Sequence, residues 1–250
     1  MALTGPWPYP RWIAHRGAGK LAPENTLAAF RIGAGHGYRA FECDVKLSAD
    51  GVPFLLHDTT LERTTSGQGT ASRLTWSELA RLDAGAWHGN AYAGEPPPSL
   101  DAIAAYCIRN DYALNIEIKP TPRDDTTTGA RVATEVARLW AAQIVAPLLS
   151  SFSTDALRAA RDTDARWPRA LLLDELRDGW LGEAQSLGCV AVVMNYRVMD
   201  DAVIEQLHDA GLRALVYTVN DDAIAQRLLA LGIDGIITDA VDRFSPTSAT

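Results

Sequence analysis

The sequence has few cysteines, no long apolar run and no leader-like start, and each of these shortages excludes a class of protein. Cys43, Cys107 and Cys189 are far apart and form no Cys-x-x-Cys pair, which argues against a zinc cluster or a disulfide framework and favours a reducing compartment. No segment approaches a membrane span, and residues 1–9 contain prolines but no apolar run suited to a signal peptide. We therefore expect a soluble, cytoplasmic protein without a membrane partner.

Basic residues are also scarce. The chain has 23 Lys and Arg against 31 Asp and Glu, which gives a formal net charge of -8 at pH 7. A broad electrostatic attraction to nucleic acid is therefore not expected. Any phosphate must be bound locally, by a metal ion or by a few basic groups. The composition does not indicate an oligomeric state.

The chain contains no internal repeat, no low-complexity tract and no linker-like stretch. Its 250 residues, of which 47% are hydrophobic, are a usual length for one α/β barrel and supply an ample core. We expect one domain over residues 1–250. A long polar region at about 59–98 is predicted to be an insertion that caps the barrel mouth, because loops of this length are usually functional or carry structure of their own.

Short apolar strands alternate with helices of amphipathic spacing along most of the chain. The strands are expected at residues 12–14, 41–47, 52–57, 112–119, 146–152, 169–173, 189–194, 213–218 and 235–238. The helices are expected at 27–34, 77–82, 99–109, 129–143, 154–161, 176–187, 200–210, 221–231 and 240–244. If 52–57 is an outgrowth of the second strand, the other strands and helices close a (β/α)8 TIM barrel, an α/β fold. An open sheet of nine parallel strands would need a crossover before 52–57, and residues 48–51 are too few for one.

The stretch 40–58 reads as a β-hairpin with a polar face. Side chains alternate along a strand, so Glu42, Asp44 and Lys46 point one way while their neighbours point the other. Asp50-Gly51 is a strong signal for a two-residue hairpin turn. That turn would set Asp44 opposite His57. An ordinary edge hairpin with two solvated acids would have the same pattern.

Other polar residues stand where strands end, which is where TIM barrels place their active sites. The first strand ends in His15 and Arg16. The strand at 112–119 places Asn115, Glu117 and Lys119 on one face. That face points into the barrel, where the alternative to a functional site is a buried ion-pair network, which adds little net stability.

Glu42, Asp44 and Glu117 supply three hard oxygen ligands that converge on one point. Such a set suits one divalent cation, Mg²⁺ or Ca²⁺, better than zinc, which prefers His or Cys. His15 and His57 come from different strand ends and together suggest a general acid and a general base at one phosphorus centre.

Arg16 and Lys119 would hold the phosphate oxygens, Arg as a fork and Lys as a point charge. Phe152, Tyr217 and Trp87 are candidates for an apolar wall around the substrate, although each could simply pack. Asn195 and Asn220 could cap the following helices, and Asp58 is expected to be structural.

Several motifs in order closely resemble the glycerophosphodiester phosphodiesterase family. They lie at residues 15–17, 23–26 with Phe30, 42–45, 50–51, 57–58, 61–65, 117–119, 217–220 and 235–239, so the likeness covers nearly the whole chain. The resemblance implies a TIM barrel of the phospholipase-C-like phosphodiesterase type with a small insertion after the second histidine. It also implies a divalent metal and hydrolysis of glycerophosphodiesters to glycerol 3-phosphate and an alcohol.

Carried over by position, His15 and His57 match the family's acid and base, and Arg16 and Lys119 match its phosphate contacts. The family's metal ligands match Glu42, Asp44 and Glu117. Tyr217 stands where the family commonly has Trp, which leaves the leaving-group preference open. Two other functions remain as alternatives: a lysophospholipase D-type lipid phosphodiesterase, for which the polar residues 59–94 offer no apolar entry loop, and a non-catalytic metal or phosphate-binding module.

Overall fold

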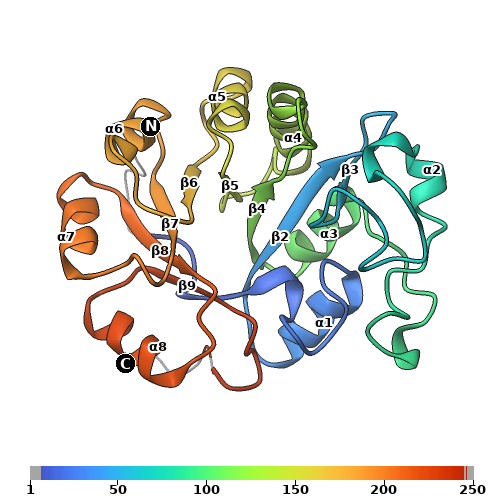
Figure 1. Ribbon diagram of the computed structural model, residues 1–250, viewed down its shortest axis with the longest axis horizontal. Helices are drawn as coiled ribbons and strands as arrows, with labels where there is room; N and C mark the ends of the chain where they lie inside the picture. Colours follow the sequence, from blue (N-terminus) through green and yellow to red (C-terminus); the bar gives the residue numbers. More distant parts are fainter. Residues whose placement is uncertain (1–6, 245, 247–250) are drawn as a thin grey trace.

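The computed structural model describes residues 7–244 and 246, and its sheet closes on itself (Figure 1). The strand β1 pairs in parallel with β9 on one side and with β2 on the other, so β1, β2 and β4 to β9 form a closed barrel of eight parallel strands. The bounds are β1 Trp12–Ala14, β2 Ala40–Leu47, β4 Ala113–Ile118, β5 Leu148–Ser151, β6 Arg169–Leu173, β7 Ala191–Asn195, β8 Arg213–Tyr217 and β9 Gly235–Thr238. The prediction of a (β/α)8 barrel is confirmed.

Helices surround the barrel between its strands (Figure 1). They are α1 Leu27–Gly35, α3 Leu100–Arg109, α4 Asp125–Leu139, α5 Thr154–Thr163, α6 Trp180–Ser186, α7 Asp201–Asp209 and α8 Asp222–Ala230. Several helices have an N-cap residue whose side chain accepts a hydrogen bond from a backbone N–H of the first turn. Thr26, Ser99 and Asp221 cap α1, α3 and α8 in this way. These caps explain why the predicted starts of α1, α3 and α8 are correct to within a residue.

Three of the helix predictions need correction, and one of them is α4, which spans Asp125–Leu139 rather than 129–143. The expected helix at 240–244 is a turn, in which the N–H groups of Arg243 and Phe244 both donate to the carbonyl of Ala240. A single turn fixes several residues for few hydrogen bonds and does not propagate. The helix α6 begins at Trp180 rather than at residue 176, after Gly179 with a left-handed φ of 77°.

Alternation along the strands separates two cores. Phe41, Cys43 and Val45 of β2 pack outward against the helices, whereas Ile13, Leu215 and other residues fill the barrel interior. Because the opposite side chains of β2 then point into the barrel, Glu42, Asp44 and Lys46 are buried. The predicted division of faces is therefore confirmed.

The hairpin forms, but its predicted register is wrong by one residue. The strand β3, Pro53–Leu55, pairs antiparallel with β2 so that Val45 faces Leu55, and the N–H of Leu56 donates to the carbonyl of Asp44 at 3.1 Å. Asp44 thus lies opposite Leu56, not His57. The reason is a three-residue loop that ends in Gly51 with φ +76°, a common alternative to the two-residue turn.

Residues 59–98 form an insertion beside β3 (Figure 1). It contains α2, Trp76–Leu79, and two short 3-10 helices, Ala71–Arg73 and Asn90–Tyr92. A small core of its own is made by Leu61, Ala71 and Leu79 with Phe54 and Leu56 of the hairpin. That the insertion caps the barrel mouth stays a prediction.

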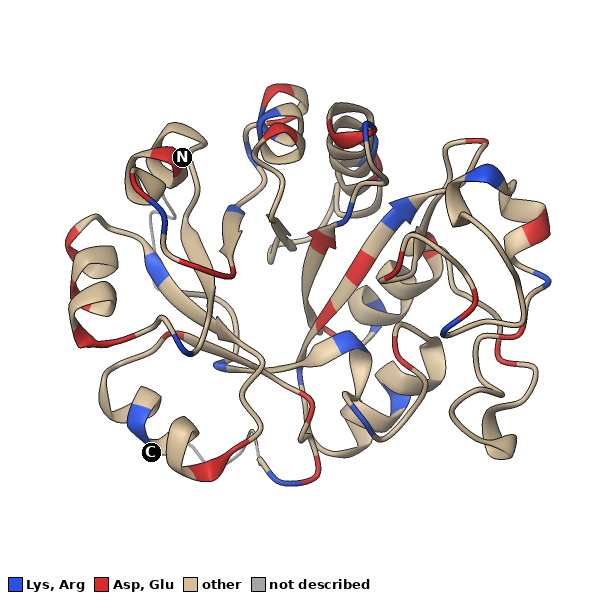
Figure 2. Ribbon diagram, in the orientation of Figure 1, with Lys and Arg blue, Asp and Glu red and all other residues tan. Residues whose placement is uncertain are grey.

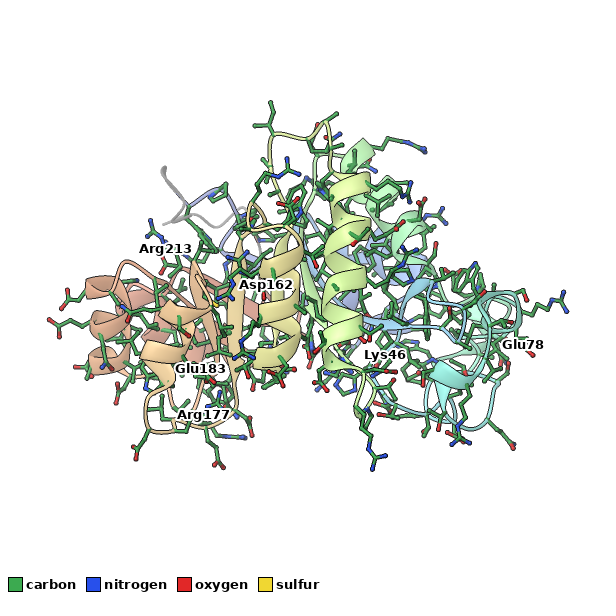
Figure 3. All side chains as sticks on the ribbon, turned by 90° about the horizontal axis from the view of Figure 1, so that it is seen from above. Lys46, Glu78, Asp162, Arg177, Glu183 and Arg213 are labelled. Atoms are coloured by element: carbon green, nitrogen blue, oxygen red, sulfur yellow. The ribbon has the colours of Figure 1, made fainter. Side chains whose placement is uncertain are left out.

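The eight strands of the barrel run in one direction, so all their carboxyl ends meet at one end of the barrel. Figure 3 looks across the barrel and shows Arg213, which begins β8, towards one end, and Arg177, which follows β6, towards the other. In the described part of the chain, none of the helices combines the length and apolar character needed to cross a membrane. Residues 1–6, part of the segment examined for a signal peptide, lie outside the described residues.

We predict that Gly129→Ala destabilises the protein by roughly 1–3 kcal/mol. An added Cβ at Gly129 in α4 would lie 2.1 Å from the carbonyl oxygen of Ala156 in α5, so the two helices would have to separate. Gly182→Ala is the matched control, since nothing lies within 4 Å of its added Cβ and Ala favours helix by about 0.5–1 kcal/mol. Urea denaturation measures both, and equal effects would contradict this account of the packing.

Candidate functional site

A cavity of about 420 Å³ opens at the carboxyl ends of the strands. It is lined by His15, Arg16, Glu42, His57, Asn115, Glu117, Lys119, Phe152, Leu172, Asp174, Tyr217, Thr218 and Ile237. Of the side chains predicted for the site, Asp44 lies buried beside this cavity, Trp87 lies outside its lining, and all the others line it. The structure therefore brings the predicted residues together in one place.

Glu42, Asp44 and Glu117 form a cluster in which one oxygen from each lies within 4.8 Å of the others. The cluster follows from strand register: β2 and β4 are parallel neighbours in which Asp44 pairs with Glu117, and the two-residue period places Glu42 on the same face. Figure 2 shows the acidic positions of β2 beside that of β4. Glu42 and Asp44 are 3% and 1% exposed.

Burial and mutual repulsion shift the pKa values of these carboxyls. Burial and the neighbouring Asp44 raise the pKa of Glu42 to about 8 and also raise the pKa of Glu117. Burial acts on Asp44 in the same sense, but Lys119 and Arg16 outweigh it and hold the pKa of Asp44 well below its usual range. Asp44 is thus the carboxylate that stays charged most readily.

The residues of this cluster fit a hard divalent cation. The buried Oε1 of Glu42 has no hydrogen-bond partner within the described chain, and a buried oxygen of this kind is costly to leave unpaired. All three ligand groups are carboxylates, the type that Mg²⁺ and Ca²⁺ prefer. A cation at this point would meet three oxygens and neutralise their repulsion.

Asn25 holds Asp44 in place, and sequence reasoning gave it no role. Its amide donates to Asp44 Oδ2 at 2.8 Å and its side-chain oxygen accepts from the Asp44 backbone N–H at 3.1 Å. Asn25 has a φ of 59°, a conformation that Asn tolerates better than most residues. The motif at 23–26 was the available signal for it.

Each histidine is oriented by a carboxylate. His15 Nδ1 lies 2.6 Å from Asp239 Oδ1 and His57 Nδ1 lies 2.6 Å from Asp58 Oδ1. A carboxylate only accepts, so each Nδ1 carries the proton and each Nε2 is left for the cavity. His15 Nε2 is 3.8 Å from Glu42 Oε2.

The environments shift the pKa values of the two histidines in opposite directions. Burial favours neutral His15, but its hydrogen bond to Asp239 and the charge of Glu42 prevail and raise its pKa. Burial lowers the pKa of His57 despite the attraction of Asp44. The two environments therefore bias the rings in opposite directions, His15 towards the imidazolium and His57 towards the neutral imidazole.

Asp239 and Asp58 are themselves held. Asn220 donates to Asp239 Oδ2 at 3.2 Å and accepts the Asp239 N–H at 2.8 Å. Arg63 donates to both oxygens of Asp58, at 2.6 and 2.9 Å. Asp221, not Asn220, caps α8, and the suggested capping role of Asn220 is wrong.

Arg63 also links the insertion to the barrel. It makes two hydrogen bonds of 2.8 Å to Glu24, and Glu24 in turn accepts from Arg16 at 2.8 Å. A bidentate pair of this kind fixes orientation as well as charge. The side chains of Arg16 and His57 are thereby connected through one chain of ion pairs.

Arg16 and Lys119 flank the carboxylate cluster. Lys119 Nζ lies 3.2 Å from Asp44 Oδ1 and 2.8 Å from Glu117 Oε1. Arg16 Nε lies 3.3 Å from Asp44 Oδ2, and its backbone N–H donates to Glu42 Oε2 at 3.0 Å. Both cations thus reach the cavity next to the acidic cluster.

Phe152 and Tyr217 form an aromatic rim, with ring centroids 5.9 Å apart at 90°. Trp87 lies outside the residues that line the cavity, and its indole N–H donates to the Ala84 carbonyl within the insertion. Asn195 does not cap α7, since Asp200 does. Asn195 instead donates to Asp174, a cavity residue that sequence reasoning missed.

Comparison with known proteins gives one family. The sequence model of the Glycerophosphoryl diester phosphodiesterase family matches residues 15–243. A glycerophosphodiester phosphodiesterase of Caldanaerobacter subterraneus subsp. tengcongensis is 31% identical over 234 residues, which cover 91% of this chain and 93% of that protein.

Solved structures agree with this match. An Oleispira antarctica phosphodiesterase in complex with the product sn-glycerol-3-phosphate is 31% identical, with a TM-score of 0.88 over 94% of this chain and 95% of that chain. A glycerophosphodiester phosphodiesterase of Agrobacterium tumefaciens is 29% identical, with a TM-score of 0.81 over 94% of this chain and 98% of that chain.

We predict that Glu42→Gln stabilises the metal-free protein at pH 8 by a few degrees in melting temperature. The pKa of Glu42 is raised from 4.5 to about 8 in the folded protein. Between these pH values the folded protein therefore binds a proton that the unfolded chain has lost. The resulting stability is present near pH 4.5 and is lost as the pH rises through 8. The variant removes that dependence, so thermal melts of wild type and variant should diverge between pH 5 and 8; parallel curves would contradict the prediction.

Proposed function

The chain belongs to the glycerophosphoryl diester phosphodiesterase family, and from this premise we propose that it hydrolyses glycerophosphodiesters to glycerol 3-phosphate and an alcohol with His15 and His57 as its acid-base pair. One observation carries the proposal: two histidines, each held at Nδ1 by a carboxylate at 2.6 Å, line one cavity with a buried carboxylate cluster. The proposed activity requires this combination, and a binding module does not.

The phosphate of the substrate would lie between Arg16, Lys119 and the two histidines. Arg16 offers a planar fork and Lys119 a point charge. Phe152 and Tyr217 would contact the organic parts of the substrate at the rim, as their place in the cavity lining supports.

Glu42, Asp44 and Glu117 would hold one Mg²⁺ or Ca²⁺ ion, which supplies charge neutralisation at a phosphate oxygen. The residues of the chain perform the other parts of catalysis. One histidine removes a proton from the nucleophile, and the other donates a proton to the departing alkoxide. The nucleophile is either water, which gives glycerol 3-phosphate directly, or the glycerol 2-hydroxyl, which gives a cyclic phosphate that water then opens. Asp58 and Asp239 keep the Nδ1 protons in place, so both transfers occur at Nε2.

We also propose that the chain forms one domain, of which the insertion at 59–98 is a part, and that it acts in the cytoplasm on a small soluble substrate. The three cysteines are free and buried, which suits a reducing compartment. Arg63 of the insertion reaches both Asp58 and Glu24, which supports a joint unit.

We expect chelator-treated protein to release no glycerol 3-phosphate from glycerophosphocholine or glycerophosphoethanolamine, and added Mg²⁺, Ca²⁺ or Mn²⁺ to restore release. A coupled assay for glycerol 3-phosphate measures this. Restoration by one ion identifies the metal that suits the three carboxylates. Metal binding without release from either ester would favour a lipid substrate or a non-catalytic role.

We expect His15→Ala and His57→Ala each to lower kcat by roughly 10²–10⁴-fold, the usual contribution of a general acid or base. His208→Ala is the matched control. It breaks another histidine–carboxylate pair, His208 Nε2 to Asp234 Oδ2 at 2.8 Å, at residues that do not line the cavity. Near-normal turnover in both cavity variants would disprove the assignment.

A further inference from the structure

We propose that Asp174, with the aromatic rim of Phe152 and Tyr217, forms a subsite for a positively charged leaving alcohol, an organic ammonium such as choline or ethanolamine. This inference rests on the proposed hydrolysis of glycerophosphodiesters and names the class of alcohol that the site selects. Asp174 directly follows β6 at the cavity. It plays no part in the chemistry described above.

The contacts of Asp174 leave its negative charge without a basic partner. Asn195 donates to Asp174 Oδ1 at 2.9 Å, and the hydroxyl of Tyr217 lies 3.3 Å from the same oxygen. Both donors are neutral. Within residues 7–244 and 246, no Lys, Arg or His nitrogen is within ion-pair distance of Asp174, whereas Asp44, Asp58 and Asp239 each have at least one.

Asp174 is exposed at the mouth of the cavity, where water can solvate its charge, and there it adds a negative charge to a cavity proposed to bind an anion. A phosphodiester carries a negative charge, and a second negative charge in its cavity opposes binding. This repulsion is offset if the bound molecule also carries a positively charged group that lies next to the carboxylate. Glycerophosphocholine and glycerophosphoethanolamine have this distribution, since two carbons separate the phosphate ester oxygen from the ammonium.

The order of side chains across the cavity matches such a molecule. Lys119 pairs with Glu117 at 2.8 Å and lies 5.9 Å from the centroid of Phe152. Phe152 contacts Tyr217 edge to face, and Tyr217 reaches Asp174. Across the cavity, the carboxylate cluster is therefore followed by Lys119, then by the two aromatic rings, and finally by the carboxylate of Asp174.

The aromatic rings suit an ammonium for a second reason. Phe152 is 44% exposed, an unusual exposure for a large apolar ring, and its face can attract a cation. A quaternary ammonium has no N–H to donate, so an aromatic face and a nearby carboxylate are the groups that recognise it. Tyr217 contributes its ring to the same wall, while its hydroxyl lies 3.2 Å from the Leu173 carbonyl and 3.3 Å from Asp174 Oδ1.

The test compares two esters in wild type and in Asp174→Asn, which keeps an oxygen for Asn195 and Tyr217 but removes the charge. We expect kcat/KM for glycerophosphocholine to fall about three- to tenfold, while kcat/KM for glycerophosphoglycerol, whose leaving alcohol is neutral, stays nearly constant. Glu175→Gln is the matched control, because it removes the same charge from an exposed neighbour that does not line the cavity. Phe152→Leu should lower the choline preference in the same direction.

Other results would overturn the inference and leave the proposed function standing. Equal losses on both esters would mean that Asp174 serves the glycerol moiety or the fold, and no loss on either would mean that it binds no ammonium. If wild type releases glycerol 3-phosphate from neither ester, the proposed function fails. In that case, calorimetry measures the binding of both esters to His57→Ala and to the double variant that also carries Asp174→Asn. The inference stands if His57→Ala binds the choline ester more tightly than the glycerol ester and the double variant loses this preference, and it fails otherwise.

Discussion

The burial of three carboxylates at the ends of two neighbouring strands is the constraint on which the rest of the site depends. In-register pairing of β2 and β4 places Asp44 beside Glu117, and the period of the strand adds Glu42. Such a cluster is unfavourable by itself, because each charge is removed from water and repels the others. The surrounding side chains can be understood as responses to that problem.

Asp44 receives most of the compensation. Arg16, Lys119 and Asn25 each contact one of its oxygens, whereas Glu42 keeps a buried oxygen without a partner. Compensation is therefore uneven, and it leaves one side of the cluster unsatisfied. A fully paired ion network would have no such atom, so the alternative of a purely structural buried network is disfavoured for this cavity.

The fold and the principal site residues could be predicted because they follow from local rules. Strand alternation placed Glu42 and Asp44 on one face, and the shared edge of parallel strands brought Glu117 and His15 to them. The register of the hairpin could not be predicted, because two-residue and three-residue loops both suit Asp50-Gly51 and differ by one residue in pairing. His57 nevertheless reaches the cavity, since it follows β3 rather than belonging to it.

The residues that hold others in place were harder to find. Asp239 and Arg63 act on His15 and on Glu24 across 224 and 39 positions of sequence, and no local period links such pairs. Asp174 was missed for a related reason: an acid after a strand is ordinary in sequence, and its meaning depends on the absence of a basic neighbour in space. Only the folded structure shows which residues distant in the chain meet and which residues lack a partner.

The charges of the cavity also make metal and substrate binding interdependent. When all three carboxylates are ionised, as metal binding requires, they sum with Arg16 and Lys119 to a formal charge of −1 beside the place where a phosphodiester anion would lie, which opposes its binding. A divalent cation on the carboxylates would reverse that sign. By linkage, whatever the cation adds to the affinity for the anion, the anion adds equally to the affinity for the cation. Arg16 and Lys119 can therefore serve the phosphate only when Asp44 has another positive charge to contact, and this is the physical reason for combining a carboxylate cluster with two basic residues in one cavity.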